Sequence, residues 1–196
     1  MLRPRQPHGA VIAPETGLGV SGLVPADAGD FTAVGEEGGH RTLAAQTPRK
    51  WVVVSALAER FGHASAERAL SGLGIEAVWQ ALGLIDGVRS DRDKTAAGIA
   101  RDAFACRDPI AEETIAVFTG FLGSMAGDLA LTLGARTGVY IAGGIVPGWG
   151  ERFDTQQFLD RFRACLSAVP VHVVIHPHPG LAGVEHLLGH HMAGRS

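Results

Sequence analysis

Short runs of apolar and β-branched residues begin the chain, and each run ends at a turn-forming segment. Residues 10–13 predict a strand, residues 14–17 contain the Pro and Gly of a turn, and residues 18–24 predict the returning strand. The pattern therefore predicts a hairpin in which glycines supply unusual backbone angles. Residues 31–34 predict a third strand, which runs directly into a segment rich in Glu and Gly.

Helical patterns follow the predicted strands. Residues 50–61 combine a β-branched run with Ser, Ala, Leu, Glu and Arg, and the second group favours a helix. Ser65 is a candidate N-cap for a short helix that contains Glu67. Further helices are expected at residues 75–82, after a break at Gly72-Leu73-Gly74, and in the second half of residues 90–106.

One long helix is the clearest single element that the pattern predicts. Asp108 is a favourable N-cap, and Pro109 suits the first helical position. Apolar residues then recur at steps of three and four residues, as one face of an amphipathic helix requires. Gly134 is the expected end of the helix. The residues of the apolar face are Ile115, Phe118, Leu122, Met125, Leu129 and Leu133.

Strands and helices alternate in the last part of the chain. The expected elements are a buried strand at residues 139–142, a helix at 158–166, a strand at 171–175 and a final helix at 184–191. Alternation of this kind indicates an α/β layered fold.

Composition narrows the class of protein. The chain has 196 residues, of which 46% are hydrophobic and 19% charged, and its net charge is −3. No basic stripe indicates nucleic-acid binding, and no stretch reaches the roughly 18 uninterrupted apolar residues of a membrane span. Cys106 and Cys165 give neither a metal spacing nor a disulfide framework, which favours a reducing compartment. We therefore expect a cytoplasmic protein that binds neither nucleic acid nor membranes.

Two short runs contain the residues best suited to bind a sugar. Glu37 and His40 lie in a Glu-Gly-Gly-His run, and Glu67 lies in a Ser-Ala-Glu-Arg run. An ionised Glu has only acceptor oxygens, so it can take neighbouring hydroxyl donors, and such charge-assisted hydrogen bonds are strong. The alternative that the residues leave open is a solvated pair of Glu side chains with a loop His.

Two glycine-rich turns are candidates for nucleotide contacts. The turn Thr16-Gly17-Leu18-Gly19 offers backbone N–H groups that can cradle a phosphate. Gly143-Gly144 follows a buried strand, where it would let a base or ribose approach the backbone. Each segment is equally compatible with an ordinary turn. His186 and His190 share a predicted helix face but have no carboxylate or Cys partner in register, so no metal site is predicted.

In this order along the chain, these segments resemble the bacterial glucokinase family, within the sugar-kinase and actin-like ATPase fold. The matching segments are Thr16-Gly17-Leu18-Gly19-Val20, Glu37-Gly38-Gly39-His40, Phe61-Gly62-His63, Ser65-Ala66-Glu67-Arg68, Leu70-Ser71-Gly72, Leu129-Ala130-Leu131, Leu133-Gly134, Ile141-Ala142-Gly143-Gly144-Ile145-Val146-Pro147 and Pro179-Gly180-Leu181-Ala182-Gly183. Each segment alone is weak evidence, whereas their ordered combination is specific.

The resemblance implies an activity and a set of binding residues. The family transfers the γ-phosphoryl group of ATP, with Mg²⁺, to the 6-hydroxyl of glucose, which is the first step of glycolysis, and the resemblance suggests a homodimer. The residues implied to contact glucose are Glu37, His40 and Glu67. The residues implied to contact ATP are Thr16, Gly17, Gly19, Gly143 and Gly144.

The chain departs from the family at the catalytic residues. The family has an early Asp with a Gly-Gly-Thr run for phosphate and metal, and an Asn-Asp pair whose Asp is the general base, but this chain contains no Asn. The resemblance therefore implies that residues 9–196 are the C-terminal (large) domain, preceded by a non-family start at residues 1–8. This domain would be a lobe of the actin-like ATPase (ribonuclease H-like) fold, with a mixed sheet flanked by helices. The N-terminal lobe and the catalytic residues would be absent.

Local departures leave alternatives for function. Glu15 stands where the family usually has Gly, and its carboxylate would repel ATP phosphates; Glu36 replaces a small residue beside Glu37. The leading hypothesis is an ATP-dependent glucokinase whose base lies outside this chain. The alternatives are a non-catalytic truncated kinase lobe that binds sugar or protein partners only, and a poorly stable fragment with unpaired strand edges.

Overall fold

The protein is built around a five-stranded mixed sheet. A computed structural model describes residues 7–26, 31–88, 94–163, 166, 168–176 and 179. Its strands are β1 (Gly9–Pro14), β2 (Leu18–Pro25), β3 (Phe31–Glu36), β4 (Gly138–Ile141) and β5 (Val171–Val173). The strand order is β3-β2-β1-β4-β5, in which β3, β2 and β1 pair antiparallel and β1, β4 and β5 pair parallel. The predicted hairpin and α/β class are thus confirmed.

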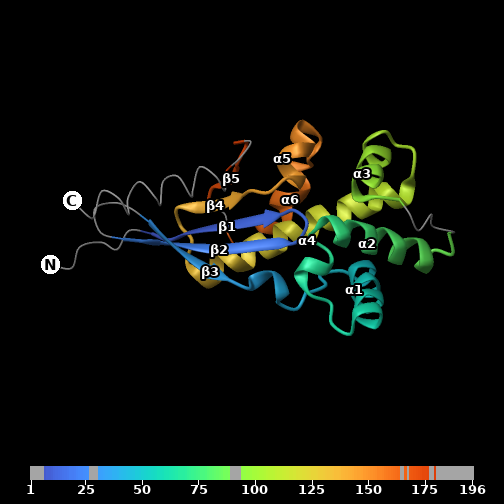
Figure 1. Ribbon diagram of the computed structural model, residues 1–196, viewed down its shortest axis with the longest axis horizontal. Coiled ribbons are helices and arrows are strands. Elements are labelled where there is room, and N and C mark those ends of the chain that lie inside the picture. The colour runs from blue at the N-terminus through green and yellow to red at the C-terminus, as the bar shows by residue number, and fades with distance from the viewer. Residues whose placement is uncertain are drawn as a thin grey trace.

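Helices and 3-10 turns make up the rest of the described regular structure. The helices are α1 (Pro48–Phe61), α2 (Gly72–Ile85), α3 (Ala96–Phe104), α4 (Pro109–Leu133), α5 (Ile145–Trp149) and α6 (Thr155–Phe162), and the 3-10 turns are η2 (Gly38–His40), η3 (Ala66–Arg68) and η4 (Gly150–Arg152). Figure 1 shows the sheet and the group α1, α2 and α3 at opposite ends of the long axis, with α4 crossing behind the sheet between them.

The long helix α4 is the centre of the core. Asp108 caps it by accepting from the backbone N–H groups of Ile110 and Ala111 at 3.0 and 3.1 Å, and Gly134 ends it in the left-handed conformation, as predicted. Residues beyond the predicted apolar face are also buried, Phe121 among them, because α4 contacts α2 and α3, α6 and the sheet. By length and composition α4 could span a membrane, but 72% of its most apolar window is buried inside the protein, as in a core helix.

The start of α2 corrects a prediction. The sequence predicted a break at residues 72–74 and a helix from residue 75, whereas α2 begins at Gly72. Ser71 caps it, since its hydroxyl accepts from the N–H of Gly74 at 3.0 Å. A Cβ at Gly74 would lie 2.7 Å from the carbonyl carbon of Ala69, so glycine is needed there for a close approach within the first helical turn.

Other element ends also differ from expectation. The helix predicted at residues 158–166 is α6, which runs from Thr155 to Phe162, and β5 ends at Val173 rather than at residue 175. Ser65 precedes the short turn with Glu67 as predicted, but its side chain makes no cap hydrogen bond. The helix predicted at residues 184–191 lies outside the described residues.

Candidate functional site

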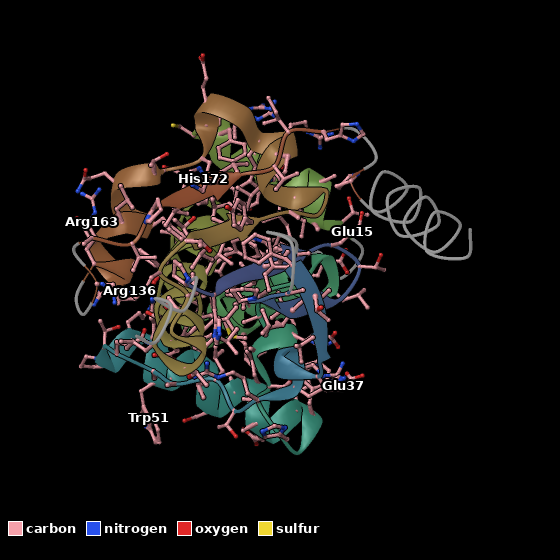
Figure 2. The ribbon with its side chains drawn as sticks, turned by 90° about the vertical axis from the view of Figure 1, so that its left-hand side faces the viewer. Glu15, Glu37, Trp51, Arg136, Arg163 and His172 are labelled. Carbon is pink, nitrogen blue, oxygen red and sulfur yellow. The ribbon has the colours of Figure 1, made fainter. Side chains whose placement is uncertain are left out.

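The candidate site lies where β1 and β4 end. These strands are parallel neighbours, so the turns that follow them meet at the same edge of the sheet. The turn after β1 contains Thr16 and Gly17, and the turn after β4 contains Gly143 and Gly144. Figure 2 shows Glu15, in the first of these turns, on the same side of the molecule as Glu37, opposite Arg136.

The turn after β1 is closed by its own backbone and by a carboxylate. The N–H of Glu15 donates to the carbonyl oxygen of Gly17 at 2.8 Å. The N–H of Leu18 donates to Oε2 of Glu67 at 3.0 Å, although the residues are 49 positions apart. A Cβ at Gly17 would lie 2.7 Å from the same Oε2, so glycine allows the carboxylate to reach the backbone. The structure thus joins the candidate phosphate turn to a candidate sugar residue.

The position of Glu67 is fixed from both sides of η3. Before it, the N–H of Ala66 donates to the carbonyl oxygen of Arg41 at 2.9 Å. After it, the hydroxyl of Ser71 donates to the backbone oxygen of Glu67 at 2.8 Å while capping α2. The carboxylate is therefore held by a rigid turn rather than by a loose loop.

The turn that carries Glu37 and His40 packs directly on β2. A Cβ at Gly39 would collide with the carbonyl oxygen of Leu18, and a Cβ at Gly38 would lie 3.0 Å from Cγ1 of Val20. Glycine is therefore required at position 39 by close approach to the strand, and a side chain at position 38 would have to displace Val20. The ring Nε2 of His40 lies 3.6 Å from Oε2 of Glu37, and these side chains are 63% and 92% exposed.

A short bridge connects this turn to the turn with Glu67. Thr42 and Ser65 pair as an isolated antiparallel bridge, and the N–H of Leu43 donates to the carbonyl oxygen of Ala64 at 2.9 Å. The structure therefore brings Glu37, His40 and Glu67 onto adjoining turns.

The diglycine turn reaches the same place from β4. Gly143 has a φ of +78°, and a Cβ there would collide with the carbonyl oxygen of Pro14. A Cβ at Gly144 would lie 3.5 Å from Oε1 of Glu15. Both glycines thus lie against the turn after β1, and the predicted nucleotide residues are neighbours in space.

A cavity of about 410 Å³ adjoins the diglycine turn, between α3 and the segment α5–η4. Its walls are apolar and aromatic, with two arginines. Cζ of Arg152 lies 5.1 Å from the ring centroid of Phe104, and the rings of Phe104 and Trp149 meet edge to face at 5.6 Å. The lining residues are Ile75, Ala96, Ala97, Ala100, Arg101, Phe104, Gly144, Ile145, Gly148, Trp149 and Arg152.

Sequence reasoning missed this cavity and the bond from Leu18 to Glu67. Arg101 and Phe104 are three residues apart on α3, so they share a side of that helix, whereas Trp149 and Arg152 lie on α5 and η4, which Gly150 separates with a positive φ. That spacing is a usable signal only once the two segments are known to face each other.

Among the described residues, no group of three or more His, Cys, Asp or Glu is placed to hold a metal ion.

Comparison with known proteins places the chain among sugar kinases. A family model described as Glucokinase matches residues 3–191. A glucokinase of Aromatoleum aromaticum is 45% identical over an alignment 196 positions long. The alignment covers 95% of this chain and 58% of that protein. The chain thus spans somewhat more than half the length of that curated relative.

Solved structures of glucokinases also superpose on this chain. A glucokinase from an Antarctic psychrotroph superposes with a TM-score of 0.80 at 32% identity, covering 91% of this chain and 56% of that one. A glucokinase from Balamuthia mandrillaris, solved in complex with glucose, superposes with a TM-score of 0.77 at 22% identity, covering 90% and 52%. The latter supports the α/β fold with a mixed sheet flanked by helices.

Proposed function

Because the chain belongs to the glucokinase family, we propose that it forms the glucose- and nucleotide-binding part of an ATP-dependent glucokinase. The observation that carries this proposal is the hydrogen bond from the N–H of Leu18 to Oε2 of Glu67 at 3.0 Å. It ties a carboxylate suited to sugar hydroxyls to a turn suited to phosphate. Phosphoryl transfer depends mainly on positioning the acceptor beside the donor phosphate, and a shared, rigid edge serves that need.

Glucose is bound by Glu37, His40 and Glu67 in this proposal. Oε2 of Glu67 accepts from Leu18, which leaves Oε1 to accept a sugar hydroxyl. Glu37 and His40 are exposed and adjacent, so together they supply a carboxylate acceptor and an imidazole that can donate or accept. The glycines between them hold the backbone of the turn close to β2.

The nucleotide occupies the neighbouring turn and cavity. Backbone amides of the turn from Thr16 to Gly19 bind phosphate, and Gly143 and Gly144 let the adenosine approach the backbone. The cavity of about 410 Å³ fits a base, since it continues directly from Gly144 and has aromatic walls. Mg²⁺ enters as part of MgATP, because such ions are bound through one or two carboxylates and the substrate's phosphates.

The proposal also states which lobe of the family's fold the chain forms. Residues 9–196 correspond to the C-terminal (large) lobe of the actin-like ATPase fold, with residues 1–8 outside it. The Asn-Asp pair of the family is not among the 196 residues, since they include no Asn. The chain by itself is thus expected to bind glucose without appreciable turnover, because loss of a general base costs roughly 100- to 10,000-fold in rate. A homodimer and a cytoplasmic location belong to the same proposal.

Calorimetric titration with glucose tests the sugar site. The wild-type chain should bind glucose, and Glu67→Gln should weaken binding by roughly tenfold, because a charge-assisted hydrogen bond is lost. Glu59→Gln is the matched control, since Glu59 is an exposed residue of α1. Equal weakening by both variants, or no binding by the wild type, would contradict the proposed sugar site.

A coupled assay for glucose 6-phosphate tests the catalytic half of the proposal. The wild-type chain should form almost no product from glucose and MgATP. Robust turnover would show that a base is present among these residues. Glucose binding without any nucleotide binding would instead favour the alternative of a non-catalytic sugar-binding lobe.

A further inference from the structure

The cavity beside Gly144 contains side-chain donors but no side-chain acceptors. Of its lining residues, only Arg101, Trp149 and Arg152 have polar side-chain atoms, and all of these are N–H donors. We propose that this cavity accepts guanine and hypoxanthine nucleotides as readily as adenine nucleotides. This inference rests on the proposed function and specifies which donor nucleotides its site takes.

The edges of the purines explain this expectation. Guanine presents acceptors at O6 and N7, a pair that arginine binds with two parallel hydrogen bonds. Adenine presents N7 but has a donor amino group at position 6, which requires an acceptor such as the amide oxygen of Asn or Gln. Because no lining side chain supplies one, the cavity has no side-chain means of favouring adenine over guanine.

The position of Arg152 makes it the main candidate for contact with the base edge. Its Nε donates to the carbonyl oxygen of Trp149 at 3.3 Å, and its Cζ lies 5.1 Å from the ring centroid of Phe104. Arg152 is itself exposed, but these two contacts place its guanidinium beside the aromatic wall of the cavity, with the terminal Nη groups as donors for a ligand. Arg101 lies on the facing helix α3, and its side chain is 72% exposed.

Several of the backbone acceptors around the cavity are engaged in local structure. The carbonyl oxygen of Gly144 accepts from the N–H of Gly148 at 3.2 Å, and that of Trp149 accepts from Arg152. Ala96, Ala97 and Ala100 belong to α3, where carbonyl groups serve the helix. Two carboxylates lie near lining residues without lining the cavity themselves: Oε1 of Glu15 is 3.5 Å from the position of a Cβ at Gly144, and Oδ1 of Asp102 is 3.6 Å from Nε of Arg101. Apolar stacking therefore supplies most of the base contact, and stacking does not discriminate between purines.

Calorimetric titrations of the chain with MgATP, MgGTP, MgITP and MgUTP test the inference. The dissociation constants for the three purine nucleotides should agree within roughly threefold, and MgUTP should bind more weakly because its smaller ring stacks less well. MgATP binding more than tenfold tighter than both MgGTP and MgITP would overturn the inference while leaving the proposed function intact. Failure of every nucleotide to bind, with glucose still bound, would remove the nucleotide half of the proposed function and this inference with it.

A substitution at Arg152 tests which side chain reads the base. Arg152→Gln introduces an amide that can pair with N6 and N7 of adenine, so the preference should shift toward MgATP by roughly tenfold. Arg136→Gln is the matched control, because Arg136 is exposed and lies on the opposite side of the molecule from Glu15 (Figure 2). The same purine ratio in both variants would overturn the role of Arg152. A thermal melt of each variant confirms that the fold is intact.

Discussion

Arg49, in the helical half of the molecule, is closely paired with carboxylates, whereas Glu15 and Glu37, on the turns at the sheet edge, are exposed to solvent. Arg49 donates to Glu113 at 2.7 Å and to Asp86 at 2.6 Å, and so links α1, α2 and α4. Glu37, by contrast, is 92% exposed and lies 3.6 Å from His40. The helical pairs satisfy one another and hold the helices together. The turns keep acceptor capacity for a ligand, as a binding edge requires.

The two regions also differ in how their backbones meet. The helices pack mainly through side chains such as Phe118 and Leu122, which are fully buried, although a Cβ at Gly123 of α4 would collide with the carbonyl oxygen of Phe158 in α6. The turns pack through glycines, because Gly39 and Gly143 approach the carbonyl oxygens of Leu18 and Pro14 too closely for any side chain. The site is therefore rigid for steric reasons, and substitutions in it should be costly even where little apolar surface is buried.

The largest expected effect is on stability, at Gly143. Gly143→Ala should lower the free energy of unfolding by about 3 kcal/mol, because a positive φ costs an L-residue about 1–2 kcal/mol and overpacking adds a similar amount. Urea denaturation measures the loss. Gly148→Ala is the control, since a Cβ there meets no atom within 4 Å. Equal losses in the two variants would show that the approach to Pro14 does not constrain the turn.

This contrast also explains what the sequence could predict. The strands, α4 and its ends at Asp108 and Gly134 follow local patterns of apolar residues and caps, so the existence of each strand and both ends of α4 were predicted correctly, although some strand bounds were not. The bond from Leu18 to Glu67 and the cavity between α3 and α5 join segments far apart in sequence, so no local pattern reveals them. The glycines that begin α2 were mistaken for a break, because their close approach to Ala69 is visible only in the fold.

An intermediate effect is expected at Lys50, which differs from the paired charges of its region. Only 7% of Lys50 is exposed, and its Nζ lies 4.6 Å from the ring centroid of Phe121. Burial, with the positive charge of Arg161, lowers the pKa of Lys50 to about 8. An unfolded lysine has a pKa near 10.4, so the unfolded state binds more protons between these values. Stability should therefore rise with pH across this range, because the buried charge is lost.

Substitution of Lys50 tests the predicted rise of stability with pH. Lys50→Met should raise the free energy of unfolding by about 1–3 kcal/mol at pH 7, and the gain should vanish above about pH 10.4. Lys94→Met is the matched control, because Lys94 lies 2.6 Å from Asp108 and 2.9 Å from Asp102 and should be destabilising to remove. Urea titrations at pH 7 and pH 10.5 measure the free energy of unfolding of each variant. Stabilisation of Lys50→Met that does not change with pH would contradict a buried charge as the cause.

The smallest expected effect concerns the exposed carboxylate of Glu15. It stands in the candidate phosphate turn, with Oε1 3.5 Å from the position of a Cβ at Gly144, so it should repel a bound triphosphate. Glu15→Gln is expected to tighten MgATP binding by about twofold to fivefold at low ionic strength, and by less at high salt, because exposed charges are screened.

Titration with adenosine distinguishes this charge effect from a change in the shape of the site. Calorimetry should show unchanged adenosine affinity in Glu15→Gln, because adenosine has no phosphate for the carboxylate to repel. Weaker MgATP binding in this variant would mean that Glu15 attracts the ligand, as a carboxylate does when it helps to hold Mg²⁺. The exposed turn would then resemble the helical half of the molecule after all, with its carboxylate satisfied by a cation that arrives with the substrate.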